Sequence, residues 1–338
     1  MLYKYILKIA LVYTGTILGA GFATGKELVS FFAQFGNMGI LGFLISCLLL
    51  ALTCMSILNM IYKTKVNTYS QFIHNIFGRY GVYIEWFNIA LLFILFSAML
   101  AGGGATLCNM FNINEMASII IFCIITFIAL IFGKDAIINI NTILCPILIL
   151  GGILIGIYVY FNATPVFNNN IKPIISPFIY TSYNGITTIS VLFAIRDIVK
   201  NKKIVIYSSI LGGVFIFSIG IFMLLPLTKN YDYIYNSPLP LLKLIENKSI
   251  IKNIYAFTVL SAIFTTAVSN GVALETTFKE KYNINGLSLK IILIVVGISF
   301  SLMGFSNIVN IVYPIFGAIG MFEILVIMLS FFSSSIDK

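Results

Sequence analysis

The first hydrophobic segment of the chain contains the stretch Gly15-Thr16-Ile17-Leu18-Gly19-Ala20-Gly21-Phe22-Ala23-Thr24-Gly25-Lys26-Glu27, in which four glycines and two charges interrupt an apolar run. A helix that only anchors a protein in lipid would carry an unbroken row of Leu, Ile and Val. Backbone N–H and C=O groups freed by a break find no water inside a bilayer, so a break survives only where protein or a cavity satisfies them. The stretch therefore predicts a broken membrane helix beside a binding site.

The composition describes a protein that crosses a membrane many times. Of 338 residues, 60% are hydrophobic and 9% are charged, and the mean hydropathy is +1.05, which is typical of polytopic membrane proteins. A span needs roughly 20 apolar residues. Ten segments meet this requirement: 5–36, 38–62, 82–108, 115–132, 136–161, 174–199, 204–227, 251–278, 287–305 and 307–333. We therefore predict an all-α protein with one transmembrane domain over residues 1–338.

Lysine and arginine predict the orientation of these spans, because they concentrate on the cytoplasmic side. With the N-terminus in the cytoplasm, fourteen of the twenty lie inside, and both termini are cytoplasmic. The other six are Lys26, Lys172, Lys229, Lys243, Lys248 and Lys252. The net charge of +9 thus mostly reflects the lysines and arginines that orient the spans. No basic soluble surface is left to bind nucleic acid.

A secretory signal peptide is the competing interpretation of the N-terminus, since Lys4 and Lys8 flank an apolar run that ends in small residues. The apolar run continues through residues 28–32, beyond the point where a signal would be cleaved. We therefore expect a first membrane span.

The cysteines and the histidine predict no metal centre and no disulfide framework. One imidazole, that of His74, cannot build a metal site, and the cysteines lie in or at the edges of apolar spans without a paired short spacing. We expect them to be small core residues. The cysteines are Cys47, Cys54, Cys108, Cys123 and Cys145.

The chain divides into two halves of five spans on either side of a Pro- and Asn-rich connection at residues 162–173. An odd number of spans per half requires the second half to be inserted upside down, and such inverted repeats carry their site where the first helix of each repeat is interrupted. We predict repeats over about residues 1–161 and 174–333, with a second break at Ser182-Tyr183-Asn184-Gly185. The alternative is that Gly185 permits close helix packing and Asn184 bonds a neighbouring helix.

These features resemble the YkvI-type uncharacterised bacterial membrane proteins of the amino acid–polyamine–organocation transporter superfamily, whose fold is that of LeuT. The resemblance rests on the five-plus-five spans, on residues 18–27 of the first helix and on residues 182–185 of the sixth. It covers essentially the whole chain and is specific for the fold rather than for a substrate. It implies ten transmembrane helices, with helices 1 and 6 broken at mid-membrane, in a bacterial plasma membrane.

The resemblance implies a substrate site between the two breaks. The superfamily's Gly-Ser/Ala-Gly turn resembles Gly19-Ala20-Gly21, whose backbone N–H groups would meet a substrate carboxylate. A half-helix N-terminus carries partial positive charge and free donors, which favours this independently. Phe22 and Tyr183 would wall a small amphipathic ligand or simply pack. The implied substrate-binding residues are Gly19, Ala20, Gly21, Phe22, Ser182, Tyr183, Asn184 and Gly185.

The resemblance also implies a sodium site, the one ion or cofactor expected. Carbonyls of the first helix and groups of the eighth surround the ion in sodium-coupled relatives, and oxygen ligands suit this hard cation without a buried charge. The threonines could equally bond their own helix. A lysine of the fifth helix replaces the ion in proton-coupled relatives, and residues 136–161 contain none. The implied ligands are Gly15, Leu18, Ala262, Thr265 and Thr266.

Lys26 and Glu27 lie near mid-bilayer, where ionisable groups are costly and usually functional. Glu27 is nine residues from Gly36, about 13 Å along a helix. Glu27 could bind a substrate amine, carry a coupling proton, or stabilise the break by accepting backbone N–H bonds. Charges near the cytoplasmic span ends should need only snorkelling or interfacial ion pairs. These are Glu85, Arg196, Asp197, Glu275 and Glu323.

Other polar residues of the spans could line the pathway, although asparagine is abundant throughout the chain and is discounted for that reason. Glycines 102–104 of the third span are expected to permit close packing. The pathway candidates are Asn270, Gly271, Asn307, Asn310, Tyr313 and Pro314.

Among function classes, an enzyme is not expected, because no Ser-His-Asp set, HExxH motif or carboxylate pair is present. A channel lacks a filter-like repeat. We expect a secondary transporter that moves a small amino-acid-like solute by alternating access, coupled to sodium, with solute and membrane lipid as its partners. The alternatives are a germinant-receptor-like sensing subunit on a transporter scaffold and a proton-coupled transporter that uses Glu27.

Overall fold

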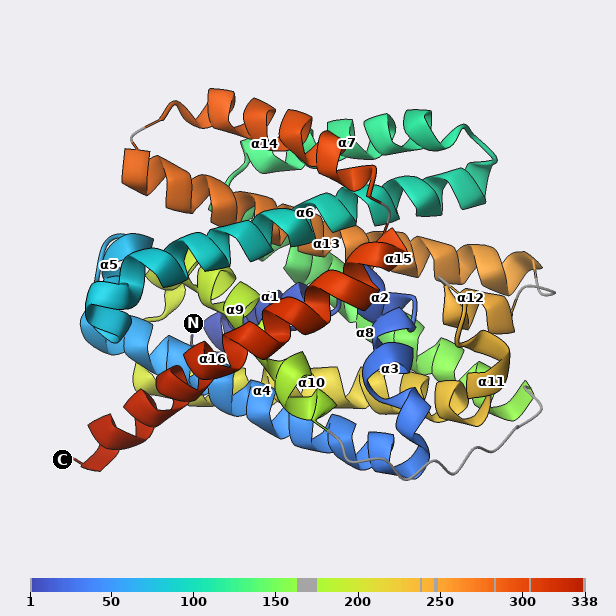
Figure 1. Ribbon diagram of the computed structural model, residues 1–338, viewed down its shortest axis with the longest axis horizontal. Coiled ribbons are helices and arrows are strands. Elements are labelled where there is room, and N and C mark those ends of the chain that lie inside the picture. The colour runs from blue at the N-terminus through green and yellow to red at the C-terminus, as the bar shows by residue number, and fades with distance from the viewer. Residues whose placement is uncertain are drawn as a thin grey trace.

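The computed structural model describes residues 2–162, 175–237, 239–245, 249–282, 284–303 and 305–336, whose regular structure is entirely helical. The long helices run side by side, with α5 at one end of the bundle and α12 at the other (Figure 1). We call these ends the α5 face and the α12 face. The first half contains α1 (Leu2–Ile17), α2 (Ala20–Ala23), α3 (Lys26–Phe31), η1 (Ala33–Phe35), α4 (Gly36–Thr64), α5 (Tyr69–Phe77), η2 (Gly78–Tyr80), α6 (Gly81–Phe111), α7 (Glu115–Ile131) and α8 (Lys134–Asn162).

The second half follows the connection after α8. It contains α9 (Ser176–Ala194), η3 (Arg196–Ile198), α10 (Lys202–Lys229), α11 (Tyr231–Ile234), α12 (Pro240–Leu244), α13 (Ser249–Tyr282), α14 (Gly286–Ser301), α15 (Phe305–Asn307), the π-helical turn η4 (Ile308–Val312) and α16 (Tyr313–Ile336).

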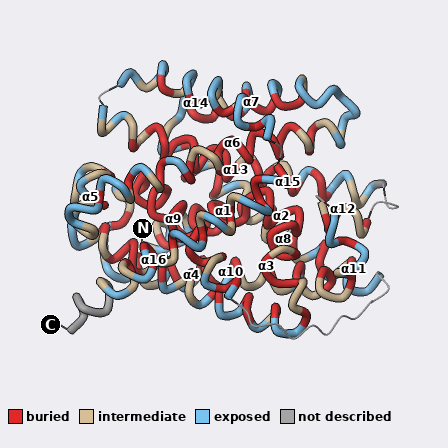
Figure 2. The backbone as a smooth tube through the Cα atoms, in the orientation of Figure 1, coloured by how far each residue is buried: buried red, intermediate tan, exposed pale blue. Residues whose placement is uncertain are grey.

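Each of the ten predicted apolar segments coincides with a helix or a series of helices in the described residues. By length and composition, six helices in the described residues can cross a membrane, one of which, Lys26–Thr64, covers parts of two predicted segments, and Glu115–Ile131 and Gly286–Ser301 are shorter apolar helices. The outer sides of α7 and α14 are exposed and apolar, for example at Ile124 and Val295 (Figure 2). Such a surface suits lipid rather than water. Ten spans remain a prediction.

Helix contacts repeat between the two halves. When α1, α4, α6, α7 and α8 are exchanged for α9, α10, α13, α14 and α16 respectively, the observed contact α1–α8 becomes the observed contact α9–α16. The same exchange turns α4–α9 into α10–α1 and α6–α7 into α13–α14, which are also in contact. This pattern supports the predicted inverted repeat.

The first span is broken, as predicted, and it is broken twice. The helix α1 ends at Ile17, where the Gly19 N–H bonds the Ile17 carbonyl at 2.8 Å. Another break separates α2 from α3 at Gly25, whose φ is +82°. Glycine adopts this left-handed backbone without the steric cost of a Cβ atom. The glycine-rich sequence is therefore used to turn the chain and not merely to bring helices close.

The predicted break in the sixth span is wrong, because α9 is continuous through residues 182–185. The Asn184 side chain donates to the Tyr180 carbonyl of the same helix at 3.0 Å. A Cβ atom on Gly185 would lie 2.5 Å from Ile324 Cδ1 of α16. The glycine thus allows α16 to approach, and one glycine costs a helix only about 1 kcal/mol. In the described residues of the second half, the α-helical geometry is interrupted instead before α16, where the short helix α15 is followed by the π-helical turn η4.

Candidate functional site

The break after α1 frees the Gly15 carbonyl, and α13 supplies its partner. The Gly19 N–H, which would reach the Gly15 carbonyl in a regular helix, turns to Ile17 instead. The Thr266 hydroxyl lies 3.0 Å from the Gly15 carbonyl and 3.1 Å from the Ala262 carbonyl. A Cβ atom on Gly19 would be 3.4 Å from Thr266. Four of the residues predicted for the substrate and ion sites therefore meet at one point.

The remaining two predicted ion ligands lie beside this point. Thr265 donates to the Ala262 carbonyl at 2.9 Å, so both threonines bond their own helix, as the alternative interpretation expected. Leu18 is buried and lines a cavity of about 10 Å³ together with Phe22 and Ala262. A space of this size is on the scale of one water molecule.

Asn141 of α8 is a polar residue at this point that sequence reasoning missed. Its amide donates to the Ile137 carbonyl at 2.8 Å and to the Ser269 hydroxyl at 3.1 Å. Its Oδ1 is buried, has no hydrogen-bond partner in the described part of the chain and overlaps the position that a Cβ atom on Gly15 would occupy. The signal was an amide in an apolar span, and it was lost because asparagine is abundant along the whole chain. Oxygen atoms from α1, α8 and α13 thus converge beside the break.

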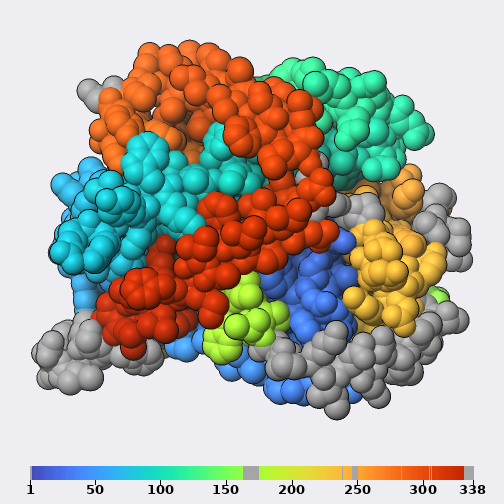
Figure 3. All heavy atoms as spheres, in the orientation of Figure 1, coloured from blue at the N-terminus to red at the C-terminus, as the bar shows by residue number. Residues whose placement is uncertain are grey.

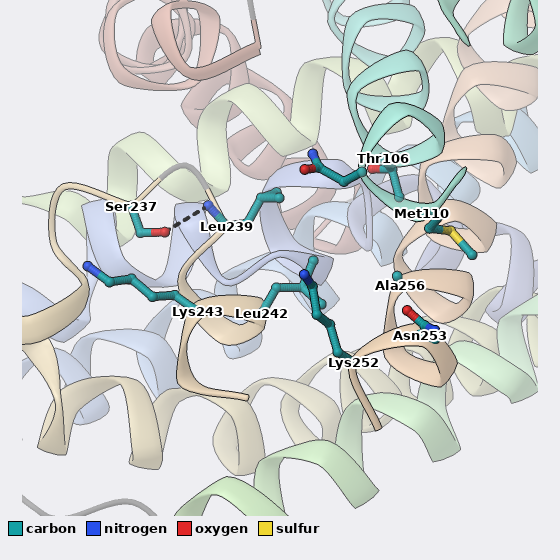
Figure 4. Close-up of a pocket in the computed structure, with 10 residues that line it drawn as sticks. Thr106, Met110, Ser237, Leu239, Leu242, Lys243, Lys252, Asn253 and Ala256 are labelled. Atoms are coloured by element: carbon teal, nitrogen blue, oxygen red, sulfur yellow. Dashed lines mark hydrogen bonds between the residues drawn. The ribbon is translucent and has the colours of Figure 1, made fainter. Parts of the chain in front are cut away.

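A cavity on the α12 face reaches the broken helix. Two hollows of about 240 Å³ each share Thr106, Asn109 and Leu239, and the inner one is also lined by Ala20 and Thr24. Figure 4 shows the outer hollow, with Thr106 and Met110 of α6 on one side and Leu239, Leu242 and Lys243 of the α12 segment on the other. The other lining residues of the inner hollow are Gly102, Ala105, Ile263, Phe305 and Asn307.

Of the predicted substrate residues in the first helix, Ala20 lines this cavity, whereas Gly19, Gly21 and Phe22 are buried and are not among its lining residues. Thr106 and Asn109 were missed, because they follow the glycine stretch of α6 that was interpreted as packing. That interpretation holds at Gly103, where an added Cβ atom would meet the Phe122 ring. Gly102 instead borders the cavity.

Glu27 is buried at the start of α3, with 3% of its surface exposed. Its Oε2 accepts a hydrogen bond of 2.5 Å from the Tyr183 hydroxyl of α9. A Cβ atom on Gly21 would overlap the carboxylate, so the glycine makes room for it. Among the described contacts, the donor to Glu27 is this hydroxyl and not a backbone N–H of the break.

Tyr183, predicted to wall the ligand, lies in an aromatic cluster around Glu27. Its ring centroid is 5.7 Å from that of Phe31, 5.4 Å from that of Tyr180 and 4.9 Å from that of Tyr313. The other predicted α9 residues are not among those that line the α12-face cavity. Ser182 donates to the Phe178 carbonyl at 2.7 Å, while Asn184 and Gly185 make the contacts described above.

The second break is covered from the α12 face. The Leu241 N–H donates to the Thr24 carbonyl at 3.1 Å, and the Tyr255 hydroxyl donates to the Ala23 carbonyl. Lys26 is buried and donates to the Tyr235 carbonyl at 3.3 Å. In the space-filling view the α11–α12 segment lies directly against the blue broken helix (Figure 3). Every carbonyl named here thus has a protein donor, as a break in lipid requires.

Ion pairs gather on the α5 face. Lys281 pairs with Glu85 at 2.9 Å, Lys290 with Glu275 at 2.8 Å and Arg196 with Glu280 at 2.8 Å, while Lys134 pairs with Asp197. These contacts confirm the expected ion pairs of Glu85, Arg196, Asp197 and Glu275. The same expectation is wrong for Glu323, which is 3% exposed and makes no ion pair within the described residues.

Comparisons with known proteins place this geometry in a known fold. No family model matches the chain. The chain is 24% identical over 324 residues to the uncharacterised membrane protein YkvI of Bacillus subtilis (strain 168), covering 93% of this chain and 92% of that protein. It is also 24% identical over 340 residues to the uncharacterised protein YyaD of the same strain, covering 97% and 98% respectively. The expected resemblance to YkvI-type membrane proteins is confirmed.

Solved structures of transporters share the fold. Mhp1, a nucleobase-cation-symport-1 family transporter, aligns with a TM-score of 0.72 and 14% identity, over 92% of this chain and 74% of that one. MhsT in complex with L-phenylalanine aligns with a TM-score of 0.70 and 15% identity, over 95% of this chain and 87% of that one. A Na⁺-coupled sialic acid symporter aligns with a TM-score of 0.64 and 14% identity, over 97% of this chain and 79% of that one. The chain is therefore a membrane protein with the LeuT fold, which these solved transporters share.

Proposed function

We propose that this protein is a secondary active transporter that moves a small, amino-acid-like solute across the bacterial plasma membrane by alternating access, coupled to sodium. One observation carries the proposal. The same broken helix presents the Gly15 carbonyl to Thr266 of α13 and presents Ala20 to the α12-face cavity. An ion and a solute bound there would both contact this broken helix, so a change in its conformation could couple their movement. In this proposal the repeats are residues 1–161 and 174–333.

Sodium would bind where the Thr266 hydroxyl now bonds the Gly15 carbonyl. If this O–H rotates toward the Ala262 carbonyl, 3.1 Å away, its oxygen and the Gly15 carbonyl both face the same point. Leu18, Ala262 and Thr265 complete the proposed oxygen set. All these ligands are neutral, so a monovalent cation can be held without burying a counter-charge. The Na⁺-coupled sialic acid symporter among the structural neighbours supports this choice of ion.

The solute would bind at residues 19–22, which it would reach through the α12-face cavity. The neutral groups of Thr24, Thr106 and Asn109 border that path, and residues 182–185 of α9 would form its far wall behind Glu27. A volume of about 240 Å³ in each hollow suits a small molecule. The L-phenylalanine in the MhsT structure supports an amino-acid-like solute. We propose that the α12 face is extracellular and that both termini are cytoplasmic.

Uptake by purified protein in liposomes tests the proposal, with a panel of amino acids offered with and without a sodium gradient. Thr266→Ala removes the proposed ligand, and we expect at least a tenfold loss of sodium-stimulated uptake. Thr277→Ala is the matched control, because this threonine is also buried on α13 and bonds its own helix, at 3.0 Å to Ala273. Unchanged sodium dependence in Thr266→Ala would refute the ion site.

A second candidate is a proton-coupled transporter that uses Glu27, favoured by the burial of this carboxyl beside Gly21 and Tyr183. In that case Glu27→Gln removes pH-driven uptake while Thr266→Ala retains it. A sensing subunit is the outcome if a solute stabilises the protein but crosses the membrane under no gradient.

A further inference from the structure

Glu323 is a buried carboxyl that the proposed transport site does not use. It lies on α16, which packs against α9, α4 and α5. Its Oε1 accepts a hydrogen bond of 2.8 Å from the Asn88 amide of α6. Its Oε2 is buried and has no hydrogen-bond partner among the described residues.

The charge of this carboxyl is not compensated, in contrast to its buried neighbours on the α5 face. The buried acidic residues in the described part of the chain are Glu27, Glu85, Glu275 and Glu323. Glu85 and Glu275 each have a lysine within 3 Å. No described ion pair reaches Glu323. An isolated carboxylate is very costly in a low-dielectric interior, whereas a neutral carboxylic acid is not.

The hydrogen bonds at the site also indicate that Glu323 is a neutral carboxylic acid. The Asn88 amide donates to Glu323 Oε1 and, at 3.1 Å, to the Tyr69 hydroxyl of α5. Its Oδ1 is buried without a donor from the residues that the structure describes, as is Glu323 Oε2. Two acceptor oxygens therefore lie on adjacent side chains without a donor, and buried acceptors are normally satisfied. One proton on Glu323 supplies the missing donor and removes the charge.

The surrounding ionisable groups in the described part of the chain offer no alternative cation. On α5 the facing group is Tyr69, whose hydroxyl lies 3.1 Å from Ser190 of α9. Glu85 of α6 is neutralised by Lys281 of α13. The described part of α4 contributes no buried charged side chain, and Arg196, which follows α9, pairs with Glu280 of α13.

The start of α5 closes the site toward the α5 face. The Tyr69 N–H donates to Glu280 Oε2 at 3.0 Å. Arg196, which pairs with the other oxygen of Glu280, also donates to the Asn67 carbonyl at 2.6 Å. The Tyr69 hydroxyl accepts a hydrogen bond from Asn88, the partner of Glu323, while the Tyr69 backbone is held by the ion pair. Displacement of α5 would therefore expose the carboxyl to water.

We propose that Glu323, paired with Asn88, is a proton-binding site, and that its proton holds the α5 face closed. Opening of this face transfers the proton from Glu323 Oε2 to water and leaves a hydrated carboxylate. Closing takes the proton back. The role in alternating access rests on the proposed function, whereas the proton site itself does not.

Infrared difference spectra of the purified protein in lipid at neutral pH test the site. Wild type minus Glu323→Gln should show the C=O band of one buried carboxylic acid. Asn88→Leu should shift this band without removing it, because the hydrogen bond to the acid is lost. A difference spectrum that contains carboxylate bands in place of the acid band overturns the proposal.

Hydrogen–deuterium exchange of residues 69–77 tests the link to closure, without any transport assay. The closed state binds the proton, so closure weakens as the pH rises. At alkaline pH we expect at least threefold faster exchange in wild type than in Glu323→Gln at the same pH, with equal rates at neutral pH. Equal rates at every pH overturn the link. If no solute is transported but both results hold, the proposed function fails and the proton site stands.

Discussion

The first helix of each half carries a similar sequence signal, and the two helices respond to it in opposite ways. The stretch at residues 15–27 breaks twice, whereas α9 runs straight through Asn184 and Gly185. The broken stretch has a glycine in the left-handed region, and partners from α12 and α13 bond its freed carbonyls. On α9 the polar side chains bond carbonyls of their own helix. A break therefore needs both a permissive residue and external donors, and α9 uses its polar groups internally.

Among the substitutions that test this comparison, Gly25→Ala should lower the free energy of unfolding the most. A left-handed conformation costs a residue with a Cβ atom roughly 1–2 kcal/mol, and the new atom would lie 3.0 Å from Leu227 and 3.1 Å from Leu241. With overpacking of about 1–3 kcal/mol, we expect a loss of about 3 kcal/mol in the free energy of unfolding, measured by thermal unfolding in detergent. Gly25→Asn should lose less, since asparagine tolerates this backbone. Equal losses would argue against strain as the cause.

Tyr183→Phe should have an intermediate effect, because it leaves the buried Glu27 carboxyl without its hydroxyl donor. Loss of a partner from a buried polar group costs about 1–3 kcal/mol. Tyr13→Phe is the matched control, since the buried Tyr13 hydroxyl of α1 has no hydrogen-bond partner among the described residues and its removal should be nearly neutral. A double-mutant cycle with Glu27→Gln measures the coupling. Additive effects of the two substitutions would mean that this hydrogen bond does not join the broken helix to α9.

Gly185→Ala should have the smallest effect. The added methyl group meets the end of the flexible Ile324 side chain, which costs about 1–3 kcal/mol, while alanine improves the helix by about 1 kcal/mol. We expect a net loss of about 1 kcal/mol in the free energy of unfolding. The double variant Gly185→Ala with Ile324→Val should recover this loss. A loss as large as that of Gly25→Ala would indicate that α9 needs its glycine for a backbone change.

Several parts of the site could be predicted from the sequence because their signal is local. Ten apolar segments and one glycine-rich stretch follow from hydropathy and from the rarity of such glycine clusters in lipid. The pairing of Gly15 with Thr266 was expected from the resemblance and is found at 3.0 Å. Asn141, Thr106 and the uncompensated Glu323 were not expected, since each depends on which neighbour faces it.

The sequence by itself determined the class of protein, the positions of the helices and the break at residues 18–19, since each of these depends on the chemistry of a short segment in lipid. Tertiary structure alone decided that α9 stays intact, that Glu27 bonds Tyr183 and that no cation of the described residues pairs with Glu323. These outcomes depend on partners that lie far apart in the chain. Only the fold determines whether a buried polar group meets a donor, a counter-charge or neither, and that decides whether the group is structural or functional.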